Sequence, residues 1–251
     1  MVWKSCCAAT LALSLAACGA AKLRPSTPPG GAAPQLLPTP AGVYRIDPAH
    51  SELRVLVYRA GPMAALGHDH VIVNHTIGGW VQLGGGAAAA SFSLSVPAAG
   101  FIVDDAAVRR DEGPQFAEEI SEDAKAGTLH NMLSPAVLDA GRFPAISIRS
   151  VAVTEARGAF EATLSVNVAG HDSTLVAPFS LERTSGRLTA SGALTLRQSE
   201  LGLIPFSVFL GALRVQDEMR VKFNLVAVAD GQGADGQGAG GQGAGGQGAG
   251  G

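Results

Sequence analysis

Apolar and polar residues alternate with a period of two along much of the chain. In residues 159–168, Phe160, Leu164 and Val166 share one face of an extended strand, and Glu161 lies on the opposite face. The same alternation marks further segments at 51–58, 90–96, 145–153, 186–197 and 219–227. Turn residues such as AGHD at 169–172 and TSG at 184–186 separate neighbouring segments at hairpin distance. The pattern predicts an all-β protein whose antiparallel strands form a barrel or a sandwich.

One segment, residues 113–135, interrupts the strands. It has acidic residues near a proline at its start, and its apolar residues recur at roughly helical spacing. These apolar residues are Phe116, Ile120, Ala124, Leu129 and Leu133. We expect one or two short helices here, covering an end of the sheet.

The N-terminus has the features of an export signal. Lys4 precedes an apolar run over residues 8–17 that is too short to span a bilayer as a helix of the mature protein. Residues 15–18, Leu-Ala-Ala-Cys, resemble the bacterial lipobox, which predicts removal of residues 1–17 and attachment of a diacylglyceryl lipid to Cys18. An ordinary secretory signal ending near residue 17 is the alternative. Two or more acyl chains anchor a protein stably, so this interpretation needs no transmembrane helix.

Composition divides the rest of the chain into three parts. Repeated prolines in residues 18–42 favour an extended tether between a membrane and the folded part. Residues 230–251 repeat Gly, Gln and Ala with almost no side chain to bury, which predicts a disordered tail. Residues 43–229 form one domain of ordinary size. We expect the protein in the bacterial cell envelope, and Gly19 after the lipidated cysteine favours the periplasmic face of the outer membrane.

The composition also excludes several kinds of chemistry. The three cysteines, Cys6, Cys7 and Cys18, all lie in the leader or at the lipidation site, so the domain has no disulfide, cysteine nucleophile or thiolate-bound metal. The net charge is −3 and the basic residues are scattered, which gives no electrostatic footprint for nucleic acid. A small or neutral partner is favoured, and no cofactor is expected.

Four segments resemble, in this order, the landmarks of the YceI-like family. They are YRIDPAHSELRVLV, LSPAVLDAGRFPAISIRSVAV, GAFEATLSVNVAGHDSTLVAPFSLE and GALTLRQSELGLIPFSVFLGALRVQDEMRVKFNLVA. The resemblance covers nearly all of the expected domain. It implies a lipocalin-like antiparallel barrel of about eight strands. It also implies an exported protein that binds, carries or sequesters a long apolar molecule such as a polyisoprenoid, without transforming it.

The inward positions leave room for such a ligand. Small residues stand at Ala162, Ala190 and Gly192, where bulkier side chains would close the lumen; a barrel packed solid is the alternative. The side chains expected to line the cavity are Leu164, Val166, Leu194, Phe206 and Phe223. Residues 201–213 are apolar but broken by proline and glycine, so they either line the cavity, close its rim or form a buried loop.

The motif LGHDHVI at 66–72 carries the only candidate polar chemistry. His68 and His70 share one face of a strand, where they could bind the polar head of a lipid or satisfy partners around a turn. Alternatively they are two ligands of a metal or haem, with a third ligand from His50 or His130. We expect no enzyme activity, because the chain has no Gly-x-Ser-x-Gly elbow and the mature domain has no thiol.

Overall fold

The computed structural model describes residues 43–184 and 186–230. The leader, Cys18, the proline-rich segment and the tail after Asp230 lie outside these residues. Export, lipidation and the disordered tail therefore stay predictions from the sequence.

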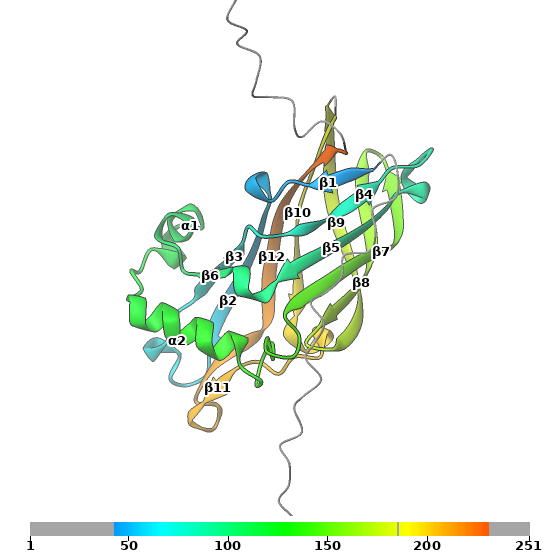
Figure 1. Cartoon of the computed structure of the whole chain (residues 1–251). Coiled ribbons are helices and arrows are strands. Elements are labelled where there is room, and N and C mark those ends of the chain that lie inside the picture. Colours follow the sequence, from blue (N-terminus) through cyan, green and yellow to red (C-terminus); the bar gives the residue numbers. More distant parts are fainter. Residues whose placement is uncertain (1–42, 185, 231–251) are drawn as a thin grey trace, which may run out of the picture. The chain divides into compact units, whose positions relative to one another are not determined.

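The described chain is an antiparallel barrel of eight strands, which confirms the expected fold class. Three of the eight strands are each broken into two shorter elements (Figure 1). The broken strands are β1 (Tyr44–Ile46) with β2 (Glu52–Ala60), β3 (His70–Asn74) with β4 (Gly78–Gln82), and β5 (Ser91–Pro97) with β6 (Phe101–Val103). The unbroken strands are β7 (Ala145–Ala156), β8 (Ala159–Val168), β9 (His171–Thr184), β10 (Arg187–Arg197) and β12 (Leu213–Ala229). A short β11 (Ser207–Val208) pairs with the start of β12.

The breaks divide the barrel into two unlike halves. Pro48 has no N–H to give to a ladder, and Asp47 accepts the backbone N–H of Ala49, so a 3-10 turn (Pro48–His50) separates β1 from β2. In the first half, β1 pairs with both β4 and β12 and closes the barrel. In the other half, β2, β3 and β6 continue from β12 as a splayed sheet that ends at β6 (Figure 1).

The segment between β6 and β7 covers this splayed half. It contains α1 (Ala106–Asp111), a 3-10 turn (Pro114–Phe116) and α2 (Glu122–Leu133). The helix expected within residues 113–135 is confirmed as α2, whereas α1 begins earlier and was not expected. The side chain of Asp105 caps α1 by accepting two backbone N–H groups.

The α1 segment covers the outer face of β2 and β3. Phe116 is buried there against Leu56, Val71 and Val73. Glu112, at the end of α1, accepts hydrogen bonds from Arg54 of β2 at 2.7 Å and from Lys222 of β12 at 2.6 Å.

The charge of Glu112 is stabilised by these two partners. Burial raises the pKa of Glu112, but the hydrogen bonds from Lys222 and Arg54 outweigh it and hold the pKa below its ordinary value. The helix is therefore fastened to the sheet by both apolar packing and ion pairs.

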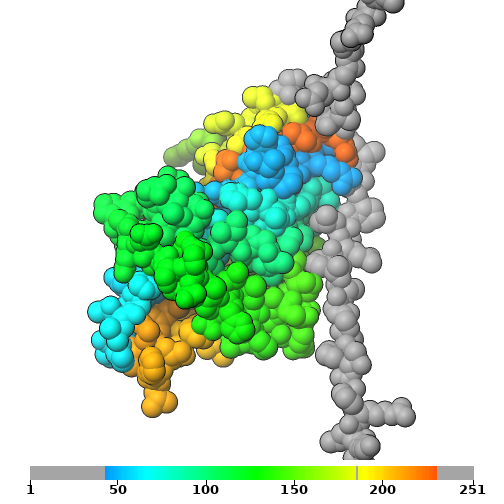
Figure 2. Space-filling view, turned by 60° about the vertical axis from the view of Figure 1, so that its left-hand side comes forward, coloured from blue at the N-terminus to red at the C-terminus, as the bar shows by residue number. Residues whose placement is uncertain are grey.

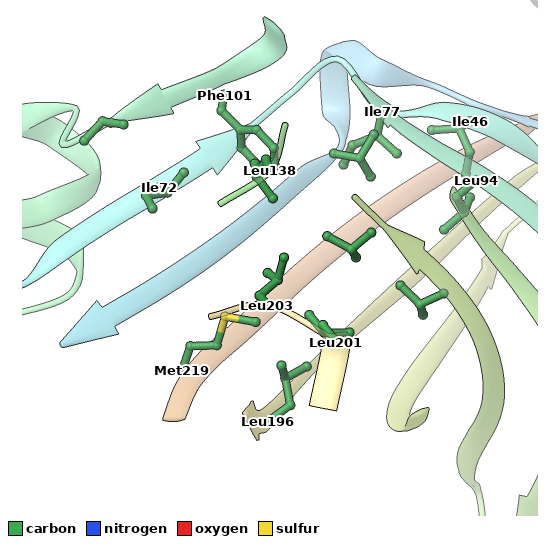
Figure 3. Close-up of a cluster of buried hydrophobic side chains, with 14 of the residues drawn as sticks. Ile46, Ile72, Ile77, Leu94, Phe101, Leu138, Leu196, Leu201, Leu203 and Met219 are labelled. Carbon is green, nitrogen blue, oxygen red and sulfur yellow. The ribbon is translucent and has the colours of Figure 1, made fainter. Parts of the chain in front are cut away.

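The main core extends through the interior of the barrel, from Ile46 of β1 to Ala227 of β12. Figure 3 shows Leu196, Leu201, Leu203 and Met219 together near the ends of β10 and β12, with Phe101 against Leu138 on the other side. The side chains of α2 that pack against this core are Leu129, Met132 and Leu133. We call the end of the barrel that contains Leu196, Leu203 and Met219 the closed end.

Candidate functional site

The barrel encloses a cavity of about 500 Å³ that reaches down to the closed end, where Leu196, Leu201 and Met219 line it. Its wall takes the inward residues of every long strand, because side chains of a strand alternate between the two faces of a sheet. On β9, for example, Leu175, Ala177, Phe179, Leu181 and Arg183 all line it. Such a volume lies within the usual range of small-molecule pockets, roughly 300 to 1,000 Å³.

Of the side chains expected on the wall, Leu164, Val166, Leu194 and Phe223 line the cavity. Phe206 does not. It is half-buried in the loop before β11, and its carbonyl accepts the N–H of Val215. Of residues 201–213, Leu201 alone lines the cavity, so most of this apolar segment does not contribute to the wall.

Small residues widen the lumen at one level. Val153, Ala162 and Ala177 lie directly opposite one another on β7, β8 and β9, and all three are buried wall residues. Ala190 also lines the cavity, as expected, but Gly192 does not add room. A Cβ at Gly192 would meet the ring of Phe223, its cross-strand partner, at 2.6 Å, so that ring already fills the space.

The cavity opens at one end of the barrel, which we call the mouth. The exposed wall residues lie there: the glycines of residues 84–86 after β4, Glu155 near the end of β7, and Arg183 near the end of β9. Tyr44 pairs with both Val81 and Ala229, so both ends of the described chain also lie at the mouth.

The wall is almost entirely apolar. Among the described residues that line it, Glu155 and Arg183 alone carry charge, and both lie at the mouth. Neither residue was expected at the site from the sequence. Their position in the sequence could have identified them, because each stands at an inward position of its strand where the alternation predicts an apolar residue.

The two histidines of the LGHDHVI motif do not line the cavity. His70 begins β3 and His68 lies just before it, in the splayed half and beneath the segment that contains α1. A ligand held within this cavity would therefore not contact them, and the expected binding of a lipid head by these histidines stays a prediction. The physical reason is that the motif lies before the break between β3 and β4, where its side chains contact the segment that contains α1.

His70 instead belongs to a buried ionic cluster. Its Nδ1 lies 2.6 Å from Oδ2 of Asp104, whose other oxygen accepts the N–H of Val71 and a hydrogen bond from Nη1 of Arg109. Asp104 is fully buried and Arg109 is 4% exposed. Arg109 also donates to the backbone oxygen of Asp69, so the cluster joins α1 to the start of β3.

The cluster favours the ionised form of its central carboxylate. Burial raises the pKa of Asp104, but the hydrogen bond and charge of His70, with further hydrogen bonds from Val71 and Arg109, hold it below its ordinary value. Asp69 accepts the backbone N–H of Arg59 and the side-chain amide of Gln115. Asp69 and His70 are thus satisfied by protein partners around a turn, which was one of the two structural roles expected for the motif, whereas Nδ1 of His68 is buried without a hydrogen-bond partner.

The arrangement does not assemble a metal site. The rings of His68 and His70 are 6.3 Å apart in an edge-on arrangement, and Nδ1 of His68 lies 3.3 Å from the carboxylate of Glu118. His50 is bound to Asp47 at 2.7 Å in the break after β1, and His130 lies on α2. Within residues 43–184 and 186–230, no three His, Cys, Asp or Glu side chains are grouped to hold a metal ion.

A nucleophile is also missing from the motif. Within the described part of the chain, neither histidine hydrogen-bonds to a serine or threonine hydroxyl, so the His70–Asp104 pair does not form a triad.

Within residues 43–184 and 186–230, no helix has the length and apolar character needed to cross a membrane.

Comparison with known proteins agrees with this architecture. The profile of the YceI-like domain matches residues 44–227. BcnA of Burkholderia cenocepacia is similar in structure, with a TM-score of 0.54 and 16% sequence identity over 73% of this chain and 99% of that chain. The Campylobacter jejuni YCEI protein gives a TM-score of 0.45 and 8% identity, over 62% of this chain and 82% of that chain. No curated protein matches the sequence.

Proposed function

The chain belongs to the YceI-like family, a family of ligand-binding barrels, and we propose that it binds and carries a long apolar molecule in its cavity without transforming it. The observation that supports this most is the wall, which is apolar everywhere except at the mouth. Burying a polar group without a partner is costly, so this lumen favours a hydrocarbon chain over a polar metabolite.

The size of the cavity limits the length of chain that it can hold. A methylene group occupies roughly as much volume as a water molecule, about 30 Å³. A cavity of about 500 Å³ therefore takes on the order of 15 carbons, or about three isoprene units. A longer polyisoprenoid would extend through the mouth.

The energetics require the chain to fill the cavity. Burying about 15 methylene groups at roughly 0.8 kcal/mol each gives a gross gain of about 12 kcal/mol. Loss of translational and rotational freedom opposes this by about 4 to 15 kcal/mol. Useful affinity therefore depends on occupying most of the lumen, which makes binding sensitive to any side chain that blocks it.

A blocking substitution tests the proposal. In Ala162→Phe the ring enters the lumen and displaces roughly three methylene groups, so affinity for farnesol falls by about fiftyfold. The measurement is displacement of the apolar dye phenylnaphthylamine from purified protein. Thr163→Phe adds the same ring on the opposite face of β8 and should bind as the unmodified protein does. Unchanged affinity in a folded Ala162→Phe variant would place the ligand elsewhere.

We propose further that the protein is exported and lipid-anchored in the bacterial envelope, with the outer membrane favoured by Gly19. The support is the leader and the lipobox, together with the position of Tyr44 at the mouth. Residues 19–42 join Cys18 to the mouth end of the barrel, which suits exchange of an apolar ligand with a membrane.

Replacing the lipidated cysteine tests the anchor. Cells that make Cys18→Ser should not incorporate labelled palmitate into the protein, and the protein should leave the membrane fraction. The unmodified chain, expressed in parallel, should carry the label. Label that persists in Cys18→Ser would contradict lipidation at this residue.

A further inference from the structure

The apolar wall determines which way round an amphiphilic ligand binds. A polar head placed deep in the lumen would find no hydrogen-bond partner on the side chains around it, because the charged wall residues lie at the mouth. A ligand with one polar end therefore binds with its chain inward and its head at the mouth. The chemistry of the mouth then selects the head.

Arg183 is placed to make this selection. It follows Phe179 and Leu181 on the inward face of β9, close to the turn between β9 and β10. That hairpin rises beyond the neighbouring strands at the top of the barrel (Figure 1). An arginine can lie with its apolar stem along the wall and still keep its guanidinium in water at the mouth. Within the described residues, Arg183 takes part in no ion pair or side-chain hydrogen bond.

We propose that the ligand is a single-chain amphiphile with an anionic head, and that Arg183 binds this head while the chain fills the cavity. The inference rests on the proposed function. The planar guanidinium presents a fork of N–H donors that matches a carboxylate or phosphate and holds it with charge-assisted hydrogen bonds.

Glu155 is the other charged wall residue and would favour the opposite head. It accepts hydrogen bonds only, so it suits an ammonium group. Glu155 pairs with Phe160, which pairs with Phe179, so Arg183 lies two strands across and four residues further along. These steps place the two residues roughly 15 Å apart, too far to neutralise each other. Because Arg183 lies four residues beyond the level of Glu155 along the wall, it stands at the outer edge of the mouth, where the head of a chain that fills the lumen emerges.

Three ligands that share one chain and differ only in the head test the inference. They are tetradecanoate, tetradecanol and tetradecylamine, each measured by dye displacement at pH 8 in low salt. We expect the acid to bind about fivefold to tenfold more tightly than the alcohol, because a charge-assisted contact at a wet mouth is weaker than a buried one. The preference should shrink as salt is added.

Variants at the mouth separate the possible outcomes. Arg183→Gln should abolish the preference for the acid and leave the alcohol within about twofold, Arg183→Lys should restore part of it, and Glu155→Gln should not reduce it. Equal binding of acid and alcohol by the unmodified protein would overturn the role of Arg183 while leaving the proposed cavity function intact. A preference for the amine that disappears in Glu155→Gln would also overturn it. If none of the three displaces the dye, the proposed function itself fails.

Discussion

The two ends of the barrel are built from the same strands but have opposite interiors. β10 and β12 run through both, with inward apolar side chains along their whole length. At the mouth these side chains surround an open lumen, whereas at the closed end Leu196 and Met219 form the floor of the cavity and pack into the core. Strand composition alone therefore does not decide whether a barrel is hollow.

The difference comes from the residues between the strands. At the closed end, loop residues enter the barrel with large side chains, and Leu138, Leu201 and Leu203 are all buried there. At the mouth, the loop after β4 contributes Leu83 to the wall and otherwise only glycine and alanine, in residues 84–87 and at Ala90. The cavity persists where no large loop side chain fills it.

The outer surface of the closed end carries exposed apolar side chains. At the closed end, the segments 61–67 and 204–213 lie side by side, joined by a hydrogen bond from Met63 N–H to the backbone oxygen of Ala212. Figure 2 shows them together in cyan and orange at the lower edge of the molecule, with the orange segment protruding. Large apolar side chains are exposed on this end: Leu66, Ile204, Phe209 and Leu210.

The largest expected effect comes from removing the carboxylate that fastens α1 to β3. Asp104→Ala leaves the buried guanidinium of Arg109 and the ring of His70 without their partner. Breaking a buried ion pair in this way costs about 3 to 5 kcal/mol. The variant should show that loss in urea unfolding at pH 7, and the cavity at the other end should still bind farnesol in the folded fraction.

Two controls establish that the loss belongs to the buried cluster. Asp105→Ala removes only the exposed cap of α1 and should cost about 1 kcal/mol. The folded pKa of Asp104 is depressed, so its stabilisation is complete above its unfolded pKa of about 3.9 and is lost as pH falls through the folded value. Stability should therefore depend less on pH below about 4 in Asp104→Ala than in the unmodified protein. Equal pH dependence in the two proteins would contradict the role of this carboxylate.

Much of the fold was predictable because the alternation of apolar and polar residues is local information. Phe160 to Val168 and Met219 to Leu225 show a period of two, and this period fixes which side chains face inward. The breaks were harder to predict. Pro48 is visible in the sequence and marks a break. Whether β2 then follows β1 or splays away from it depends on the pairing of β2 with β3 and β12, and β12 is distant in the chain.

The site was predictable only in part for the same reason. Leu164 and Phe223 could be placed on the wall from strand parity, whereas Phe206 lies in an irregular segment where parity has no meaning. His70 and Asp104 are in contact although they are 34 positions apart in the sequence, and Asp104 has a positive φ angle. No local sequence pattern predicts that contact. The sequence therefore left open whether the motif serves a ligand, a metal or a turn, whereas the structure shows Asp69 and His70 holding α1 against β3.

A matched pair of leucine truncations sharpens the comparison between the two ends. Leu203 is 9% exposed within the packed core, whereas Leu164 lies on the cavity wall with one side facing the open lumen. Leu203→Ala should cost about 2 to 4 kcal/mol, because it loses transfer free energy and leaves a new void. Leu164→Ala should cost only about 1 kcal/mol in ligand-free protein, because the removed atoms had few neighbours on the lumen side. Urea unfolding of both variants measures the difference.

The size of this difference reports whether the lumen is open in solution. If the barrel wall collapsed inward without ligand, Leu164 would be packed like Leu203, and the two truncations would cost the same. Saturating farnesol provides the matching control, since a bound chain restores neighbours to Leu164 and should raise the cost of its truncation towards that of Leu203. The cost at Leu203 should not respond to the ligand, because its contacts lie beyond the floor of the cavity. A response at both positions would mean that the two ends are not independent, and the division of the barrel into a hollow half and a packed half would have to be abandoned.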